Sequence, residues 1–242
     1  MNINLKDNLM FFHIPKNAGK SIISGFGLEK NKVLNRSVVC GLSTLHCFKQ
    51  EDINKFVKFA IIRNPFDRLV SLYHFRKKEN DLYNLFPGAN HKGGDKTTPD
   101  GRDLTFKEWV MDSRVRGLGV LWGGYYRYSK DPFLDSSKEK QLFLFDNCRD
   151  GYMMTIEWVN QIHFLTDRSG NLIPDEILRF ENLNEDIKNF CKKYNLNQVM
   201  LEKKNSSPRK KNYVDYYDDE LIEYVNRLFK DDIECLGYKF GE

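Results

Sequence analysis

Two short apolar runs, each followed by a loop and then by apolar residues at helical spacing, dominate the first third of the chain. Residues 9–14 have the sequence LMFFHI and end at a loop containing Pro and Gly, which leads into KSIISGFGL at residues 20–28. Residues 59–62 have the sequence FAII and end near Asn64-Pro65, after which apolar residues recur three and four positions apart. Short apolar runs bounded by turn residues predict buried strands, and the recurrence predicts helices. Each segment is therefore expected to form a strand–loop–helix unit.

The later segments continue this alternation. QLFLFDN at residues 141–147 predicts a strand, and residues 158–183 predict two strands around a Ser-Gly-Asn turn. Residues 184–196 and 218–238 have the apolar spacing of amphipathic helices. Strands that alternate with helices indicate an α/β domain with a central, largely parallel sheet flanked by helices.

The composition indicates a soluble globular protein, with 40% apolar and 30% charged residues. The length of 242 residues fits a single domain, residues 1–242. A net charge of +4 suits an anionic ligand but is far from the strongly basic balance of a nucleic-acid-binding protein. No apolar run approaches the roughly 20 residues of a membrane span, and the N-terminus lacks the apolar core of a signal peptide. The five scattered cysteines include no C-x-x-C pair, so we expect a reducing, cytoplasmic compartment.

The loop FFHIPKNAGKS, residues 11–21, is the first candidate for chemistry. Its end, Gly19-Lys20-Ser21, fits the nucleotide-binding pattern G-x-x-x-x-G-K-[ST], but Ile14 stands where that pattern has its first glycine. A loop between a strand and a helix directs backbone N–H groups at an anion. The segment is therefore either an altered ATP loop or an intact loop for a different phosphate ligand.

The second unit carries an arginine and a serine. Arg63 follows the predicted strand, and Ser71 lies eight residues later, about two helical turns into the next helix. An arginine at a strand end and a hydroxyl on the following helix can hold two sides of one phosphate. Spacing alone is also compatible with a surface arginine and an ordinary helical serine.

Five motifs resemble one family, and they occur in the family's order. HIPKNAGKS is similar to the H-I-P-K-T-G-G-T-S loop of the carbohydrate-type (family 2) sulfotransferases, which are related to heparan sulfate 2-O- and 6-O-sulfotransferases. IIRNPFDRLVSLYH resembles their second signature, V-R-[ND]-P-[FW]-x-R-L-V-S-x-Y. ILRFENL, NSSPRKKNYVDYY and DIECLGYKF also resemble segments of that group. The resemblance covers residues 11–240 and implies a three-layer, P-loop-like sulfotransferase fold.

The resemblance implies a donor, 3′-phosphoadenosine 5′-phosphosulfate (PAPS), whose spent form is adenosine 3′,5′-bisphosphate (PAP). The first loop would hold the 5′-phosphosulfate, the second motif the 3′-phosphate, and the later basic loop would close over the donor. Lys20 departs from the pattern, because family members usually carry Thr there. The donor-binding residues implied are Lys16, Asn17, Ala18, Gly19, Lys20, Ser21, Arg63, Ser71, Ser206, Ser207 and Arg209.

The implied reaction moves a sulfuryl group to a hydroxyl of an acceptor, expected to be a carbohydrate. Sulfuryl transfer, like phosphoryl transfer, has a loose in-line transition state, so positioning and electrostatics supply most of the catalysis. Lys16 would stabilise the leaving phosphate, and His46, between the two donor motifs, would be the base. His13 and Glu181 are expected to be structural, and the mechanism requires no metal.

Two alternatives remain. A P-loop kinase or NTPase would use Lys20 and Ser21, with Asp146 holding Mg²⁺. A non-catalytic relative would only bind a glycan or a nucleotide. The missing first glycine and the second motif argue against the first alternative, and the intact Lys16, Arg63 and Ser71 argue against the second.

Overall fold

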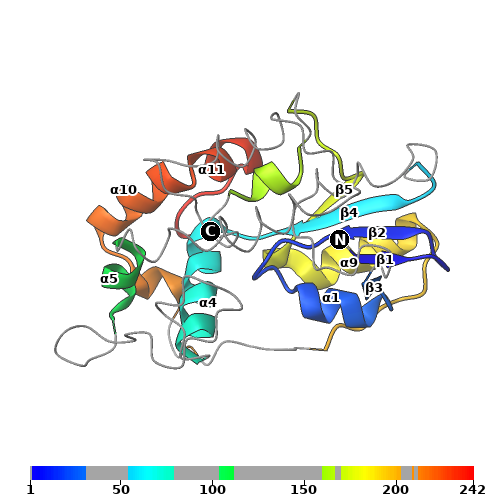
Figure 1. The fold of residues 1–242 in the computed structure, drawn as a ribbon, viewed down its shortest axis with the longest axis horizontal. Helices are drawn as coiled ribbons and strands as arrows, with labels where there is room; N and C mark the ends of the chain where they lie inside the picture. Colours follow the sequence, from blue (N-terminus) through cyan, green and yellow to red (C-terminus); the bar gives the residue numbers. More distant parts are fainter. Residues whose placement is uncertain are drawn as a thin grey trace, which may run out of the picture.

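The computed structural model describes residues 2–30, 54–78, 104–111, 160–166, 170–202, 209 and 212–242. Within these ranges five strands form one sheet, in the order β3-β1-β2-β4-β5 (Figure 1). The strands are β1 (Asn2–Asn4), β2 (Leu9–Phe12), β3 (Glu29–Lys30), β4 (Val57–Ile62) and β5 (Glu176–Arg179). The predicted strands at residues 9–14 and 59–62 are confirmed as β2 and β4.

The centre of the sheet is parallel. β2 pairs with β4 in register Phe11↔Phe59, and β4 pairs with β5 in register Ile61↔Leu178. The strands β1 and β3 add an antiparallel edge beyond β2. The carboxyl ends of β2, β4 and β5 therefore lie at one edge of the sheet, which is where open α/β sheets place their ligands.

Helices and short 3₁₀ segments connect and cover the strands. The α-helices are α1 (Gly19–Gly25), α4 (Pro65–Lys78), α5 (Phe106–Met111), α9 (Leu183–Lys193), α10 (Asp219–Leu228) and α11 (Lys230–Leu236). The 3₁₀ segments are η3 (Gln161–Phe164), η4 (Phe180–Asn182) and η5 (Tyr213–Tyr216).

Alternating side chains of the central strands build a layer on each face. Phe11 and Phe59 pack against α1 and α9 through residues such as Ile22 and Phe190. Met10, Phe12 and their neighbours on β4 instead pack against η3 and α11. Successive strand residues point to opposite faces, so an uninterrupted apolar run indicates a strand that is buried on both sides. The α/β fold with helices on both faces of the sheet is thus observed.

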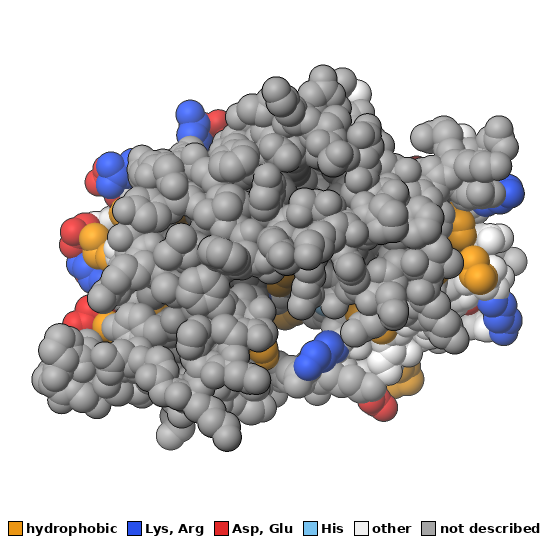
Figure 2. All heavy atoms as spheres, in the orientation of Figure 1, with side chains coloured by type: hydrophobic (Ala, Val, Ile, Leu, Met, Phe, Trp, Pro, Cys, Tyr) orange, Lys and Arg blue, Asp and Glu red, His pale blue; other side chains and the backbone are white. Residues whose placement is uncertain are grey.

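A third apolar cluster lies beyond the end of β4. It joins α4, α5 and α10 through residues that include Phe66, Trp109 and Val225, and these helices lie together at one end of the molecule (Figure 1). At their solvent side, basic and acidic side chains are interspersed (Figure 2). One such group is the ion-paired set of Lys107, Asp218 and Glu220. This cluster holds the start of α4 firmly behind the carboxyl end of β4.

Two local predictions are wrong. The first strand expected in residues 158–183 contains the 3₁₀ segment η3, and only an isolated bridge, Thr166↔Leu172, precedes β5. The backbone groups that a strand would pair bond elsewhere: His163 N and Leu165 N donate to Asn160 O and Ile162 O, and Ile162 N donates to Asp232 Oδ1. The single helix expected at residues 218–238 is broken at Phe229, which has φ −111° and ψ 33°. This turn lets α10 pack on α4 and α5 while α11 packs on the sheet.

Candidate functional site

The loop between β2 and α1 turns sharply at two residues. Lys16 has φ 72° and Ala18 has φ 58°, the left-handed conformation that favours glycine. The amides of Ser21 and Ile22 then donate to the carbonyl oxygen of Ala18, at 2.9 and 3.1 Å, and start α1. The loop keeps this costly shape because other elements hold it at several points.

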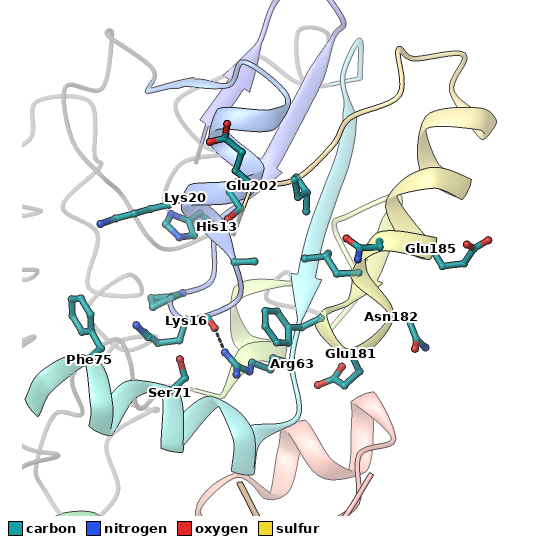
Figure 3. A pocket seen from close by; sticks show the side chains of 18 of the residues that line it. His13, Lys16, Lys20, Arg63, Ser71, Phe75, Glu181, Asn182, Glu185 and Glu202 are labelled. Atoms are coloured by element: carbon teal, nitrogen blue, oxygen red, sulfur yellow. Dashed lines mark hydrogen bonds between the residues drawn. The ribbon is translucent and has the colours of Figure 1, made fainter. Parts of the chain in front are cut away.

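Two arginines from the second unit bond to carbonyl oxygens of the loop. Arg68 Nε donates to Pro15 O at 3.3 Å, and Arg63 Nη1 donates to Lys16 O at 2.9 Å (Figure 3). The loop also sends the buried side chain of Asn17 inward, where Nδ2 donates to Ile61 O at 2.7 Å. The loop and the second motif are thus one assembly.

Gly19 is required by the close approach of His13. A Cβ built on Gly19 would lie 1.9 Å from His13 Nε2, which is too short for a contact between atoms that are not bonded. The His13 ring also stacks on Phe11, with 5.7 Å between ring centroids. His13 therefore packs against the loop, the contact that its expected structural role requires.

Arg63, Asp67 and Arg209 form a charge cluster behind the loop. The buried guanidinium of Arg63 donates to Asp67 Oδ2 from Nε at 2.8 Å and from Nη2 at 2.7 Å, and it lies 4.0 Å from the centroid of the Phe180 ring. Arg209 Nη1 forms an ion pair with the other oxygen, Asp67 Oδ1. The sequence prediction included both arginines but not Asp67, although its i,i+4 spacing from Arg63 is a recognisable helical ion-pair signal.

Burial and charge act in opposite directions on this cluster. Burial lowers the pKa of Arg63, and the Asp67 carboxylate opposes that effect. Burial alone would raise the pKa of Asp67, but the charges of Arg63 and Arg209, together with their hydrogen bonds, outweigh it and lower that pKa. Asp67 is therefore held as a carboxylate between two cations.

A cavity of about 880 Å³ opens over the loop and the charge cluster (Figure 3). Its volume is that of a small-molecule or cofactor site. The residues from the sequence prediction that line it are Lys16, Ala18, Gly19, Lys20, Ser21, Arg63, Ser71 and Arg209. Asn17 does not line it, since its side chain is fully buried beneath the loop. His46, Ser206, Ser207 and Asp146 lie outside the described residues.

The walls of the cavity differ in charge. Lys16 on the loop faces Ser71 on α4 (Figure 3). Lys16 Nζ lies 3.9 Å from the centroid of the Phe75 ring. Glu181 on η4 lies beside Arg63, Glu185 lies on α9, and Glu202 lies near Lys20 and His13 (Figure 3). An anionic group is therefore favoured on the wall of the loop and α4, with a neutral or hydrogen-bond-donating group towards η4.

Glu181 also has bonds that explain its position in the motif RFENL. Its Oε1 accepts from the Asn64 amide at 2.6 Å, and Tyr238 OH donates to Oε2 at 3.2 Å. Asn64 Nδ2 donates in turn to Lys239 O at 2.8 Å. These bonds tie the start of α4 to the end of the chain, as the expected structural role of Glu181 requires.

The described ranges give no support for a metal site or for a membrane-spanning helix. No group of three or more His, Cys, Asp or Glu side chains there is arranged to hold a metal ion. None of the helices that the structure describes combines the length and apolar character needed to cross a bilayer.

Comparison with known proteins identifies the family. The model of the sulfotransferase family matches residues 1–239, nearly the whole chain. Comparison with curated proteins and with solved structures gives no match. Sulfotransferases move sulfuryl groups to hydroxyl-bearing acceptors, and a largely parallel sheet with a cavity lined by lysine and arginine at its carboxyl edge suits that chemistry. This chain belongs to the sulfotransferase family.

Proposed function

We propose that this protein transfers a sulfuryl group from PAPS to a hydroxyl of a carbohydrate acceptor. The observation that carries the proposal is that the two elements predicted to bind anions line one cavity. The loop with Lys16 and the pair Arg63 and Ser71 come from separate strand–loop–helix units, yet they face the same space. A donor with phosphate groups at two positions of its ribose uses both elements at once.

The proposed roles follow the charges of the cavity. Lys16, with the backbone of residues 16–21, would hold the 5′-phosphosulfate, while Arg63 and Ser71 would hold the 3′-phosphate. Arg63 uses Nε, Nη1 and Nη2 for contacts within the protein, and a guanidinium carries five N–H donors. It therefore retains donor capacity for a phosphate while it supports the loop.

In the proposed reaction the acceptor oxygen attacks sulfur in line with the departing phosphate oxygen. Negative charge grows on that oxygen, and the ammonium of Lys16 stabilises it, a contribution of about 3–4 kcal/mol in comparable sites. The acceptor hydroxyl loses its proton to His46, which we keep as the proposed base on the ground of its place between the two motifs. The relationship to heparan sulfate 2-O- and 6-O-sulfotransferases is part of the proposal, and the five ordered motifs support it.

The P-loop NTPase alternative is less well supported. It gives no role to Arg63 and Ser71, which line the same cavity as the loop. It also requires Lys20 to reach the phosphates, whereas the side chain of Lys20 extends from α1 away from Arg63 (Figure 3). Lys16 lies at the turn of the loop and faces Ser71 in the cavity, which is where the proposed reaction requires a lysine (Figure 3).

Calorimetric titration with PAP, beside ATP with Mg²⁺, tests the proposal. The wild-type protein should bind PAP, and Arg63→Ala should weaken that binding. Arg179→Ala is the matched control, because Arg179 also bonds to a carbonyl oxygen, Leu236 O at 2.6 Å, and does not line the cavity. Binding of ATP with Mg²⁺ alone, abolished by Lys20→Ala but not by Arg63→Ala, would overturn the proposal in favour of the NTPase.

A further inference from the structure

A single buried glutamine bonds to both anion-binding elements. Gln161, at the start of η3, is fully buried. Its Oε1 accepts from Asn17 Nδ2 of the loop at 2.6 Å and from the backbone amide of Arg63 at 3.0 Å. One oxygen atom therefore fixes the distance between the loop and the residue that begins the second motif.

The other end of the Gln161 amide completes the arrangement. Nε2 donates to Arg63 O at 2.8 Å and to Asp232 Oδ2 of α11 at 3.1 Å. Two accepted and two donated bonds use the full capacity of the amide. Its orientation is also fixed, because the reversed amide would set its N–H groups against those of Asn17 and Arg63.

Asp232 extends the link to the loop by a second route. Its carboxylate is fully buried, and Oδ1 accepts from the Ile162 amide at 2.9 Å. Arg68 Nη1 lies 4.0 Å from Asp232 Oδ2, and Arg68 Nε bonds to Pro15 O in the loop. Burial raises the pKa of Asp232, and the charge of Arg68 opposes that shift. Asp232 thus holds the amide of Gln161 and, through Arg68, also supports the loop.

The loop depends on this support at Asn17. Nδ2 makes both side-chain bonds of Asn17, to Ile61 O and to Gln161, while Oδ1 has no hydrogen-bond partner within the part of the chain that the structure describes. Losing Gln161 would leave Asn17 attached to β4 alone. It would also leave the amide and the carbonyl of Arg63 without their buried partner.

We propose that Gln161 is a positioning residue that sets the separation of the two anion-binding elements, so that one bisphosphate ligand engages both at once. This inference rests on the proposed function. A ligand with two linked phosphates gains from a frame in which both sites are already in place, since the second contact then forms within the complex. A ligand with one phosphate needs one element only and has little to gain from the frame.

The test compares ligands as well as variants. Binding of PAP, adenosine 5′-monophosphate and adenosine 3′-monophosphate would be measured by calorimetry for the wild-type protein and for Gln161→Met, which keeps the length of the side chain without its bonds. We expect PAP to bind about 10–100-fold more weakly to the variant, the scale of a small misplacement in a site. Each monophosphate should change by less than about threefold, because each uses one element.

The neighbouring Asn160→Ala serves as the control. Asn160 also bonds within the fold, but to neither anion-binding element: its Nδ2 donates to Leu228 O at 3.3 Å, and its Oδ1 accepts from the Asp232 amide at 3.2 Å. The Asn160→Ala variant should prefer PAP over the monophosphates to the same degree as the wild type. If Gln161→Met does not fold, Asn17→Ala removes the loop end of the bridge and should show the same selective loss.

The outcomes separate the inference from the proposed function. A wild-type protein that binds PAP no more tightly than the monophosphates would overturn the proposed two-point site and the inference with it. A wild-type protein with a clear preference for PAP, together with a variant that weakens all three ligands equally or none, would overturn the role of Gln161 alone.

Discussion

Replacing Asp67 by Asn should cost the protein much of its stability. Asp67 is the carboxylate partner of two arginines, and the side chains of Arg63 and Asp67 are only 6% and 10% exposed. Breaking a buried ion pair costs about 3–5 kcal/mol, since it leaves a buried charge without its partner. We expect about 3 kcal/mol, because the Asn oxygen can still accept from Arg63. For a protein of this size, each kcal/mol lowers Tm by about 2–4 °C, so Tm should fall by roughly 6–12 °C.

The dependence on pH provides a second test of the same reasoning. The pKa of Asp67 is lowered from 3.8 in the folded protein. The contribution of its carboxylate to the free energy of unfolding is therefore complete above about pH 3.8 and is lost as the pH falls through the lower pKa of the folded state. The difference in unfolding free energy between wild type and Asp67→Asn should therefore stay constant from about pH 8 to pH 5 and shrink only below about pH 4. Denaturant unfolding followed by circular dichroism at several pH values measures it.

A matched exposed pair controls for spacing. Lys230 and Glu234 are also four residues apart, but their side chains are 59% and 62% exposed. Glu234→Gln should therefore leave Tm unchanged, since solvent screens exposed pairs. An Asp67→Asn variant as stable as Glu234→Gln, or a stability difference that already disappears near pH 6, would refute the argument from the buried cluster.

Three further predictions concern the loop. Gly19→Ala should destabilise the protein by about 1–3 kcal/mol and abolish PAP binding, since the new methyl group collides with His13; melting and titration would show both, and unchanged binding would contradict the contact. Ala18→Gly should raise Tm by about 2–4 °C, because it relieves about 1 kcal/mol of left-handed strain at φ 58°; a lower Tm would contradict that strain. Lys16→Ala should reduce kcat by about 10²–10³ in a sulfuryl-transfer assay while PAP still binds, and an unchanged kcat would remove Lys16 from the reaction.

The sequence predicts the parts of this fold that local patterns encode. β2 and β4 are buried on both faces, so their apolar runs are uninterrupted and easily recognised. β1 is short and has the sequence Asn-Ile-Asn, which contains no such run, and its pairing with β2 depends on the rest of the sheet. Local pattern therefore identifies the strands that carry the site, but not the edge that completes the sheet.

The candidate site likewise contains residues that local motifs identify and one, Gln161, that they do not. The loop motif and the arginine motif identify seven residues that do line the cavity, because each motif is contiguous along the chain, and the later basic loop adds Arg209. Gln161 is missed, since its partners Asn17 and Arg63 are 144 and 98 residues away and no local pattern marks it. The available signal is a polar residue within an apolar segment, and that segment predicts a strand.

The bonds of Gln161 also bear on how the protein acquires its activity. They join the loop, the start of α4 and α11 across sequence separations of 144, 98 and 71 residues. Contacts of such long range form late in folding, because the entropy of closing the intervening chain must be overcome first. During synthesis, moreover, the loop leaves the ribosome long before Asp232 does. Competence to hold a two-phosphate donor should therefore be among the last properties that a newly made chain acquires, well after its central strands have paired.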